Sequence, residues 1–337
     1  MTLLLAADIG GTKSELAIFD LADRRDTLPL ARKRFLNNKF RDFDEILTDF
    51  LDDTPTPDYG CLGVAAIVRQ GEAQLTNLPW KLSEHALQAK YGLHDICLIN
   101  DLTALCASLP HLQESDLLTI QQGREEKNGI QAVIAPGTGL GEGFLIPGKS
   151  FFFPKGSEGG HCDFAPLTQE QAELLAYLQK ANPSVSYELV CSGKGIPNIF
   201  DFFAATALAR DEKRLQEITT AVDRTPLIME GALADAPCPL CVKTVTTFLE
   251  ILGAEAGNLA LKLYATGGLF IGGGILPRLA GRISFAPLLE KFTQKEKMEG
   301  LMSSFPLHLI MKPDAALFGA VAYGRYHFTE ANRNDSV

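Results

Sequence analysis

Long uninterrupted apolar runs are missing from this sequence of 337 residues. A membrane-spanning helix needs about 20 mostly apolar residues, and Asp8 interrupts the apolar start of the chain early. Neither a spanning helix nor a signal peptide is therefore expected. An excess of positive charge is missing too, because 31 Lys and Arg stand against 41 Asp and Glu, a net charge of −10. Since nucleic acids and anionic membranes attract basic proteins, neither is expected as a main partner.

Cysteine clusters are also missing. The seven cysteines are odd in number and scattered, and Cys61, Cys97 and Cys106 lie in apolar stretches. This usage is typical of reduced, buried thiols and predicts a cytoplasmic protein. The lone C-x-x-C at 238–241 has neither a second pair nor a nearby His. A metal site there stays open as an alternative, but the sequence favours a non-metal role.

What is present is an alternation of strand and helix patterns. An apolar fraction of 46% with 21% charged residues is typical of a globular protein, and the length suggests two domains or one large one. The first 110 residues read as βββαβαβα. The expected elements, in order, are LLLAADI, ELAIFD, a strand near LARKRF, helix DEILTDFLDD, strand CLGVAAIV, helix SEHALQAKYG ending at Gly92, strand DICLIN and helix DLTALCASL.

The opening pattern returns after a polar linker at 121–129. Residues 130–146 again read as strand, Gly/Thr turn and strand, with Thr138 in the place that Thr12 has in the first turn. We interpret this as a weak internal repeat of two α/β halves, the alternative being chance similarity. Further on, Thr168 and Gln171 form a capping-box pattern. A long helix is then expected from about 240 to 264, a strand and glycine turn at 269–274 followed by a helix opened by Pro277, and a last helix from Pro313.

The tip of the first hairpin carries unusual chemistry. It consists of Asp8, Gly10, Gly11, Thr12 and Lys13. Glycines allow backbone N–H groups to approach an anion, while Thr and Lys add donors. A carboxylate in the same turn suits phosphate only with Mg²⁺ between them, so the tip favours a metal-bound polyphosphate. Neither the Walker nor the G-x-G-x-x-G spacing is present, and an ordinary Gly-Gly hairpin is the alternative.

Two further glycine segments fit the same interpretation. The second hairpin tip contains Gly137, Thr138 and Gly139, and could hold a phosphate chain from another side. Gly272, Gly273 and Gly274 follow a strand and would offer a surface with little steric hindrance to a nucleoside. The alternative is that 30 glycines must occur somewhere.

Two clusters of polar residues are candidates for the chemistry itself. Asp101 follows a buried strand and opens a helix, where it or Asn100 could equally be an N-cap. Glu158 and His161 are three residues apart in a glycine-rich segment, a spacing compatible with half of a metal site or with a simple turn.

Taken in order, these motifs resemble those of the bacterial glucokinases, in the hexokinase–actin fold superfamily. The matching segments are ADIGGTK, LINDLTAL at 98–105, APGTGLGEGFL, EGGHCDFAP at 158–166, YELVCSGKGI at 187–196 and GGGILPRL at 272–279. The resemblance implies a two-domain α/β protein with the actin-like ATPase (ribonuclease H-like) fold and a central cleft. Its domains would be residues 1–110 plus 312–330 and residues 111–311.

The resemblance also implies a reaction and its residues. ATP would phosphorylate the 6-hydroxyl of glucose, with Asp101 as the base that accepts the hydroxyl proton. Sugar contacts would come from Asn77, Asn100, Asp101, Glu158, His161 and Glu188. The two hairpin tips and Gly272–Gly274 would bind ATP, and Asp8 would orient Mg²⁺ through water. A homodimer is the oligomer that the family suggests.

One departure separates this chain from the related ROK group of sugar kinases and repressors. His161 is followed by a single Cys and not by the cysteine-rich zinc motif of that group, and Asp8 leaves no room for its helix-turn-helix. No structural zinc is therefore expected. Three alternatives stay open: a kinase for another hexose, a phosphate donor such as polyphosphate, and a sugar-sensing protein without catalysis.

Overall fold

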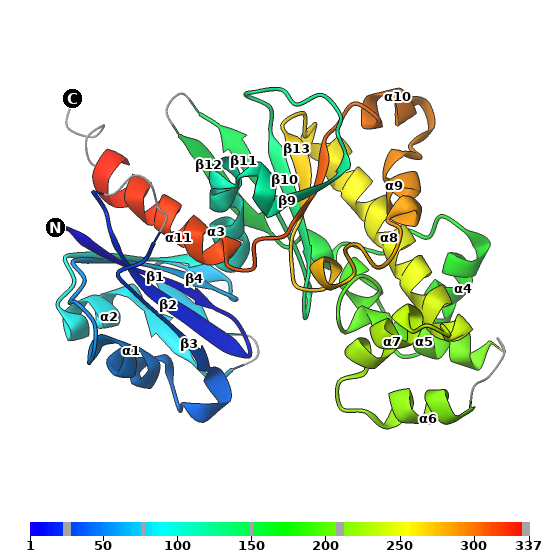
Figure 1. The fold of residues 1–337 in the computed structure, drawn as a ribbon, viewed down its shortest axis with the longest axis horizontal. Helices are drawn as coiled ribbons and strands as arrows, with labels where there is room; N and C mark the ends of the chain where they lie inside the picture. Colours follow the sequence, from blue (N-terminus) through cyan, green and yellow to red (C-terminus); the bar gives the residue numbers. More distant parts are fainter. Residues whose placement is uncertain (23–27, 76–77, 149–150, 207–211, 332–337) are drawn as a thin grey trace. The chain divides into compact units, whose positions relative to one another are not determined.

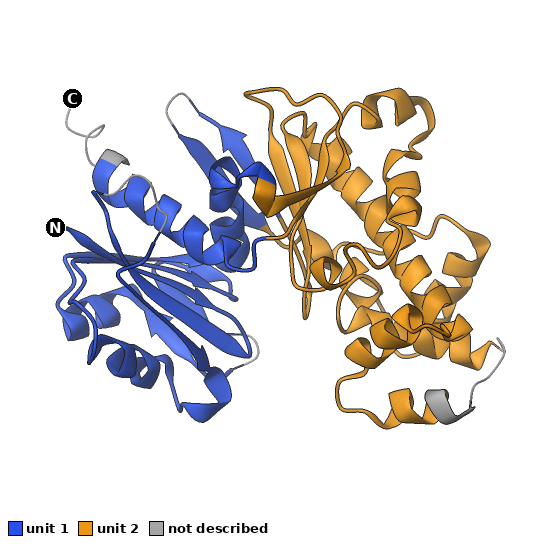
Figure 2. Cartoon of the chain, in the orientation of Figure 1, with its two compact units in different colours: residues 1–114, 143–156, 312–337 blue, residues 115–142, 157–311 orange. Residues whose placement is uncertain are grey.

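The structure is a computed structural model of the chain. It describes residues 1–22, 28–75, 78–148, 151–206 and 212–331. The chain divides into two compact units (Figure 2). Unit 1 contains Met1–Glu114, Gly143–Gly156 and Lys312–Val337, and unit 2 contains Ser115–Glu142 and Ser157–Met311. The domain division predicted at residues 110 and 312 stays a prediction, and unit 1 differs from the predicted small domain mainly by including 111–114 and 143–156.

Unit 1 is built on a sheet of strand order β3-β2-β1-β4-β8 (Figure 1). Strands β1 and β2 form an antiparallel hairpin, whereas β4 and β8 run parallel to β1. The elements are β1 (Leu3–Ile9), β2 (Lys13–Asp20), β3 (Ala31–Leu36), α1 (Phe43–Leu51), β4 (Tyr59–Val64), β5 (Val68–Arg69), β6 (Glu72–Gln74), β7 (Lys81–Ser83), α2 (Glu84–Tyr91), β8 (Asp95–Asn100), α3 (Asp101–Ser108) and α11 (Ala315–Arg325).

The apolar run of β1 is explained by burial on both faces of this sheet. Successive side chains of a strand point to opposite faces. Leu3, Leu5, Ala7 and Ile9 join the core that contains the buried residues of α1, whereas Leu4 and Ala6 join the core that contains Leu317, Ala320 and Val321 of α11. Helices therefore cover both faces, which is the usual arrangement for parallel strands (Figure 1).

Unit 2 contains most of a second sheet, of order β12-β11-β10-β13-β14-β9. Strand β13 runs parallel to β10, and β14 runs parallel to β13. The elements are β9 (Leu117–Gln121), β10 (Gln131–Pro136), β11 (Leu140–Pro147), β12 (Phe152–Ser157), α4 (Gln169–Leu178), α5 (Gly195–Ala205), α6 (Glu212–Thr220), α7 (Arg224–Leu233), α8 (Pro239–Leu263), β13 (Gly268–Ile271), α9 (Ala286–Thr293), α10 (Glu299–Met302) and β14 (Leu307–Ile310). The distal parts of β11 and β12, residues 143–156, are the hairpin counted with unit 1.

The expected elements are confirmed apart from one helix, and the structure adds elements that the sequence did not predict, among them β9, β12 and β14. The order β3-β2-β1-β4-β8 matches β12-β11-β10-β13-β14, so the repeat seen in the sequence is a repeat of strand order. The short strands β5 to β7 between β4 and α2 were not expected from the sequence. The helix expected at Pro277 is wrong, because Leu276–Arg278 forms one 3-10 turn. No helix in the described part of the chain has both the length and the apolar character needed to cross a bilayer.

Candidate active site

The first hairpin turn, in unit 1, is held by one buried side chain. The Gly10 N–H donates to the Lys13 carbonyl at 3.0 Å, which closes the turn. Asn37, only 1% exposed, donates from Nδ2 to the Gly10 carbonyl at 2.9 Å and accepts from the Ser14 hydroxyl at 2.8 Å. The amide thus fixes the base of the turn, while Thr12 and Lys13 at its tip are exposed.

Asp8 precedes this turn in β1, and burial destabilises the ionised form of its carboxyl. Burial is the largest effect and raises the pKa of the Asp8 carboxyl to about 6. Three charges have smaller effects, given from larger to smaller: Lys13 lowers the pKa, Glu15 raises it and Arg34 lowers it. Glu15 pairs with Asp8 across the hairpin, but Glu15 itself accepts from Arg34 at 2.7 Å and from Arg32 at 2.6 Å. Within the described part of the chain, the half-buried Asp8 carboxyl has no cation partner of that kind, so a bound cation would be stabilising there.

The junction of β8 and α3 presents Asp101. Asn100 is the N-cap of α3, with its side-chain oxygen accepting from the N–H groups of Leu102 at 2.9 Å and Thr103 at 3.3 Å. Its Nδ2 donates to the Ala66 carbonyl at 3.2 Å. Of the two capping alternatives, the cap is therefore Asn100, and Asp101 is the first residue of the helix, half-buried.

The parallel strands of unit 1 bring these two places to the same edge of the sheet. Ile9 at the end of β1 pairs with Val64 at the end of β4, which in turn pairs with Asn100 at the end of β8. Neighbouring strands are about 4.8 Å apart, so the ends of β1 and β8 are separated by about 10 Å. The phosphate-loop candidate and Asp101 are thus neighbours within unit 1.

The second hairpin turn, in unit 2, is held by backbone groups. The Gly137 N–H donates to the Gly139 carbonyl at 2.8 Å, and the Gly193 N–H donates to the Gly137 carbonyl at 2.7 Å. Thr138 at the tip is exposed, like Thr12 in the first turn. The turn therefore has the exposed hydroxyl and the glycines that were predicted, without a charged residue of its own.

Two predicted binding segments lie against this second turn. The Glu188 carboxylate accepts from the Leu140 N–H at 3.0 Å and lies so close to Gly139 that a Cβ there would collide with it. Gly273 has a φ of +80°, and a Cβ on it would collide with the Pro136 carbonyl. Only glycine fits such a position without strain. The structure thus places the GGG segment and Glu188 on the two sides of one turn.

Two further sugar-binding candidates, Glu158 and His161, lie in a segment that is hydrogen-bonded to the segment of Glu188. Glu158 precedes a 3-10 turn, Gly159–His161, which ends at His161 and in which the His161 N–H donates to the Glu158 carbonyl at 3.0 Å. The following residue, Cys162, accepts from the Tyr187 N–H at 2.9 Å. Since Tyr187 precedes Glu188, this hydrogen bond sets His161 and Glu188 side by side. Both Glu158 and His161 are exposed, as ligand-binding side chains must be before binding.

Three further findings complete the site residues. Asn77 lies outside the described residues. Among the described residues, no group of three or more His, Cys, Asp or Glu could hold a metal ion. Mg²⁺ is commonly held by one or two carboxylates together with substrate phosphates, so a single carboxylate, Asp8, fits the predicted role.

Asn37 was missed in the sequence because a lone Asn in the segment LNNKF carries no motif.

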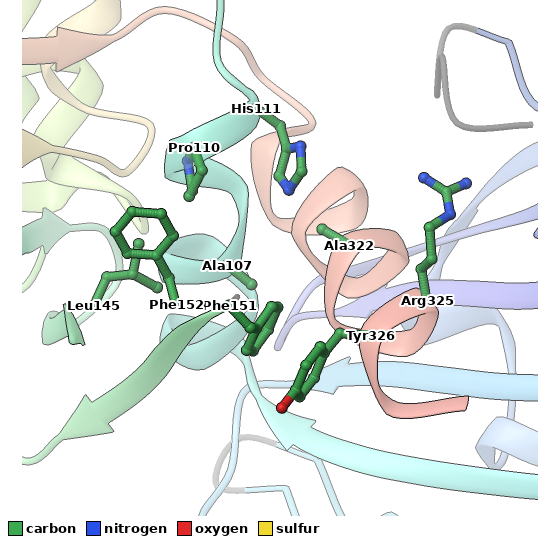
Figure 3. A pocket seen from close by; sticks show the side chains of 9 residues that line it. All are labelled: Ala107, Pro110, His111, Leu145, Phe151, Phe152, Ala322, Arg325 and Tyr326. Atoms are coloured by element: carbon green, nitrogen blue, oxygen red, sulfur yellow. The ribbon is translucent and has the colours of Figure 1, made fainter. Parts of the chain in front are cut away.

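A separate cavity of about 220 Å³ lies in unit 1 (Figure 3). Its lining includes Ala107 in the last turn of α3, about 9 Å along the helix axis from Asp101. The rings of Phe151 and Tyr326 are stacked on one side of it. No lining residue is among the predicted site residues, so this cavity is not the predicted sugar or nucleotide site.

The chain is similar to known glucokinases in sequence and in fold. A family model described as glucokinase matches residues 5–327. A glucokinase of Nostoc punctiforme is 36% identical over 335 residues, covering 95% of this chain and 98% of its own. A crystal structure of glucokinase from an Antarctic psychrotroph is 31% identical with a TM-score of 0.79, covering 96% and 99% of the two chains.

A more distant structure shares the fold. It is a ROK family glucokinase from Streptomyces griseus in complex with glucose and AMPPNP, 17% identical, with a TM-score of 0.64 and coverage of 96% and 99%. These neighbours have the actin-like ATPase fold, so the predicted fold class is confirmed.

Proposed function

Because the chain belongs to the glucokinase family, a family of sugar kinases, we propose that it transfers the γ-phosphoryl group of ATP to the 6-hydroxyl of glucose. The products are glucose 6-phosphate and ADP. The family supplies the reaction class, and the residues of each unit supply the roles below.

One observation carries the proposal. Within unit 2, the turn from Pro136 to Leu140 contacts Gly273 on one side and Glu188 on the other. A phosphate chain on this turn would therefore have a glycine surface for its nucleoside at one end and a sugar-binding carboxylate at the other. That order is the one in which nucleoside, phosphates and phosphate acceptor stand in a kinase reaction.

Unit 1 supplies the base. Asp101 accepts the proton of the sugar 6-hydroxyl, whose oxygen forms a bond to the γ-phosphorus while the bond from that phosphorus to the ADP oxygen breaks. Phosphoryl transfer requires mainly positioning and charge neutralisation. The cap that Asn100 provides to α3 fixes the backbone from which Asp101 projects, and Lys13 with the turn N–H groups offers donors to phosphate oxygens.

Unit 2 supplies the sugar contacts. The carboxylates of Glu158 and Glu188 and the imidazole of His161 accept hydrogen bonds from sugar hydroxyls. Glu188 uses Oε2 for the Leu140 N–H, and its Oε1 would accept from a hydroxyl. A sugar that lacks the matching hydroxyl would leave such a group unpaired, which is the physical basis of selectivity. Roles for Asn100 and Asn77 in sugar binding, the homodimer and the cytoplasmic location stay predictions.

Mg²⁺ fits the first turn, because no described residue gives the Asp8 carboxyl the cation partners that Glu15 has. When bound, the ion would neutralise phosphate charge. Asp8 would hold it through water, and Lys13 would donate to the same phosphates.

The test is ADP release with Mg-ATP and, separately, with polyphosphate. It uses glucose, mannose, fructose, galactose, N-acetylglucosamine and no sugar, for the wild type and D101N. Glucose-dependent release that falls by about 10²–10⁴ in D101N, with glucose binding retained, supports the proposal. Turnover on another hexose would assign a different sugar substrate. Turnover with polyphosphate would assign a different phosphate donor. Glucose binding without any turnover would instead identify a sugar-sensing protein.

A further inference from the structure

One buried carboxyl of unit 2 has no part in the proposed reaction. Glu142 lies on β11, two residues after Leu140, and is 3% exposed. Its Oε1 is buried and has no hydrogen-bond partner among the residues that the structure describes. A buried carboxylate without a partner is costly, so this position calls for an explanation.

The other carboxyl oxygen of Glu142 lies directly beneath the sugar-binding turn. Oε2 faces Gly159 so closely that a Cβ on Gly159 would collide with it, and Gly160 packs in the same way on the Leu140 carbonyl. The Ser157 hydroxyl donates to the Glu142 carbonyl at 3.2 Å, and the Gly159 N–H donates to that hydroxyl at 3.3 Å. The start of β11 is therefore the surface on which the turn between Glu158 and His161 rests.

The charges around Glu142 favour its neutral form. Burial is the main cause that raises the pKa of this carboxyl to about 7; Glu255 raises it further and Lys262 lowers it. Glu255 is fully buried on α8, where its Oε2 accepts from Asn258 at 2.8 Å and its Oε1 lies 3.6 Å from the Lys262 ammonium. The nearby cation is thus shared with a second carboxylate.

The remaining titratable groups near this pair offer no further positive charge to Glu142. The Tyr187 hydroxyl accepts from Asn258 at 3.3 Å, and the pKa values of Tyr187 and Cys191 are raised mainly by burial. Lys295 donates to the Ala254 carbonyl at 2.8 Å and to Asn258 at 2.6 Å. Glu158 and His161 belong to the turn above.

We propose that Glu142 is a positioning residue for sugar binding, and that the turn from Glu158 to His161 has its binding conformation only while the Glu142 carboxyl keeps its proton. The inference rests on the proposed function, since it assigns this turn to the sugar. Loss of the proton leaves a buried charge, which is stabilised by moving toward water. The turn blocks that path at Gly159, so ionisation displaces the turn and weakens the sugar site.

The test compares the wild type with E142Q, which keeps the shape of the side chain and cannot ionise. KM for glucose and kcat are measured from pH 6 to pH 8.5, with E125Q, an exposed carboxyl of unit 2, as the matched control. If only the protonated form binds sugar, the wild-type KM rises about tenfold per pH unit above pH 7. The ratio of wild-type to E142Q KM should follow this rise, with little change in the ratio of kcat values. E125Q should follow the wild type.

Titrations that the wild type and E142Q share cancel in this ratio. A constant KM ratio across the pH range would overturn the inference while leaving the proposed function intact, whereas absence of wild-type turnover at every pH would overturn the function itself.

A second measurement needs no variant. Glucose binding to the wild type is measured by calorimetry in two buffers of different ionisation enthalpy. We expect uptake of nearly one proton per bound sugar at pH 8 and little uptake at pH 6. Binding without proton uptake at pH 8 would overturn the inference even if E142Q fails to fold.

Discussion

The two Gly/Thr hairpin turns have the same place in two sheets of matching strand order, yet they are held and charged differently. The first has Asp8 and Lys13 beside it, and the side chain of Asn37 fixes it. The second has no charged residue in its turn, and it is fixed by the Gly193 backbone and by the Glu188 carboxylate.

The comparison shows that the repeated backbone determines where each turn lies, whereas the side chains determine the charge and hydrogen-bonding groups at each turn. In both sheets the hairpin ends at the edge where the parallel strands also end, which places a glycine turn beside the ligand-binding edge of an α/β sheet. The first turn adds the charges that a metal-bound phosphate requires. The second adds a carboxylate suited to sugar hydroxyls. The same strand order thus carries different side chains, and so different candidate chemistry, at its two turns.

The largest expected effect on the second turn comes from Gly273→Ala. The new methyl group would meet the Pro136 carbonyl, and the φ of +80° is strained for alanine. The strained φ alone costs about 1–2 kcal/mol, and the backbone collision adds to it. We expect a lower Tm and a KM for ATP raised by more than tenfold, with the KM for glucose less affected.

Gly274 is the matched control for this change, because a Cβ there meets nothing within 4 Å. Gly274→Ala should keep the wild-type Tm. If both variants lost stability equally, the close approach of Gly273 to the second turn would not be the cause.

The second comparison is between the two functions of Glu188. Glu188→Gln keeps the shape and one acceptor oxygen but removes the charge that supports the Leu140 N–H and the proposed sugar bond. A hydrogen bond to a charged group contributes about 1.5–3 kcal/mol, so KM for glucose should rise by roughly ten- to a hundredfold. Steady-state kinetics with varied glucose measures this, and a similar rise in the KM for ATP would show that the turn itself had collapsed.

The first turn can be loosened through Asn37. Asn37→Ala removes the donor to the Gly10 carbonyl and the acceptor of the Ser14 hydroxyl, leaving a buried group unpaired at a cost of about 1–3 kcal/mol. We expect a rise in KM for ATP of about tenfold and a lower Tm. Asn38→Ala, at the exposed neighbouring position, is the control and should leave both unchanged. An unchanged KM in Asn37→Ala would mean that the turn holds its shape without the amide.

The sequence predicted the features that depend on local pattern. The period of apolar residues located the strands on both sides of each turn, and a buried strand followed by glycines located the GGG segment. The capping pattern at Thr168 is confirmed, since its hydroxyl accepts from the Gln171 N–H at 3.2 Å. Gly92, with a φ of 66°, ends its helix as expected.

Features that depend on distant contacts were not predictable from one sequence. Asn37 reaches Gly10 across 27 positions, and no local motif marks such a contact. Glu142 lies within the segment APGTGLGEGFL, but only the fold shows that it is buried beneath Gly159. The strands β5 to β7 were missed because they are two or three residues long, too short for an alternating pattern to register.

The smallest expected effect concerns the charge that distinguishes the first turn. Asp8 has a pKa of about 6, above its usual 3.8, mainly because of burial. As the pH falls through 6 the carboxyl is protonated, so the Mg²⁺ concentration needed for half-maximal turnover should rise by up to about tenfold per pH unit below that value. Above pH 7 it should be constant. The measurement is a Mg²⁺ titration of turnover at fixed ATP between pH 5 and pH 8, for the wild type and D8N. D8N should need more Mg²⁺ at every pH and lose the dependence below pH 6. If D8N kept that dependence, the titrating group would be another one, and the charge at the first turn would not be what separates its chemistry from that of the second.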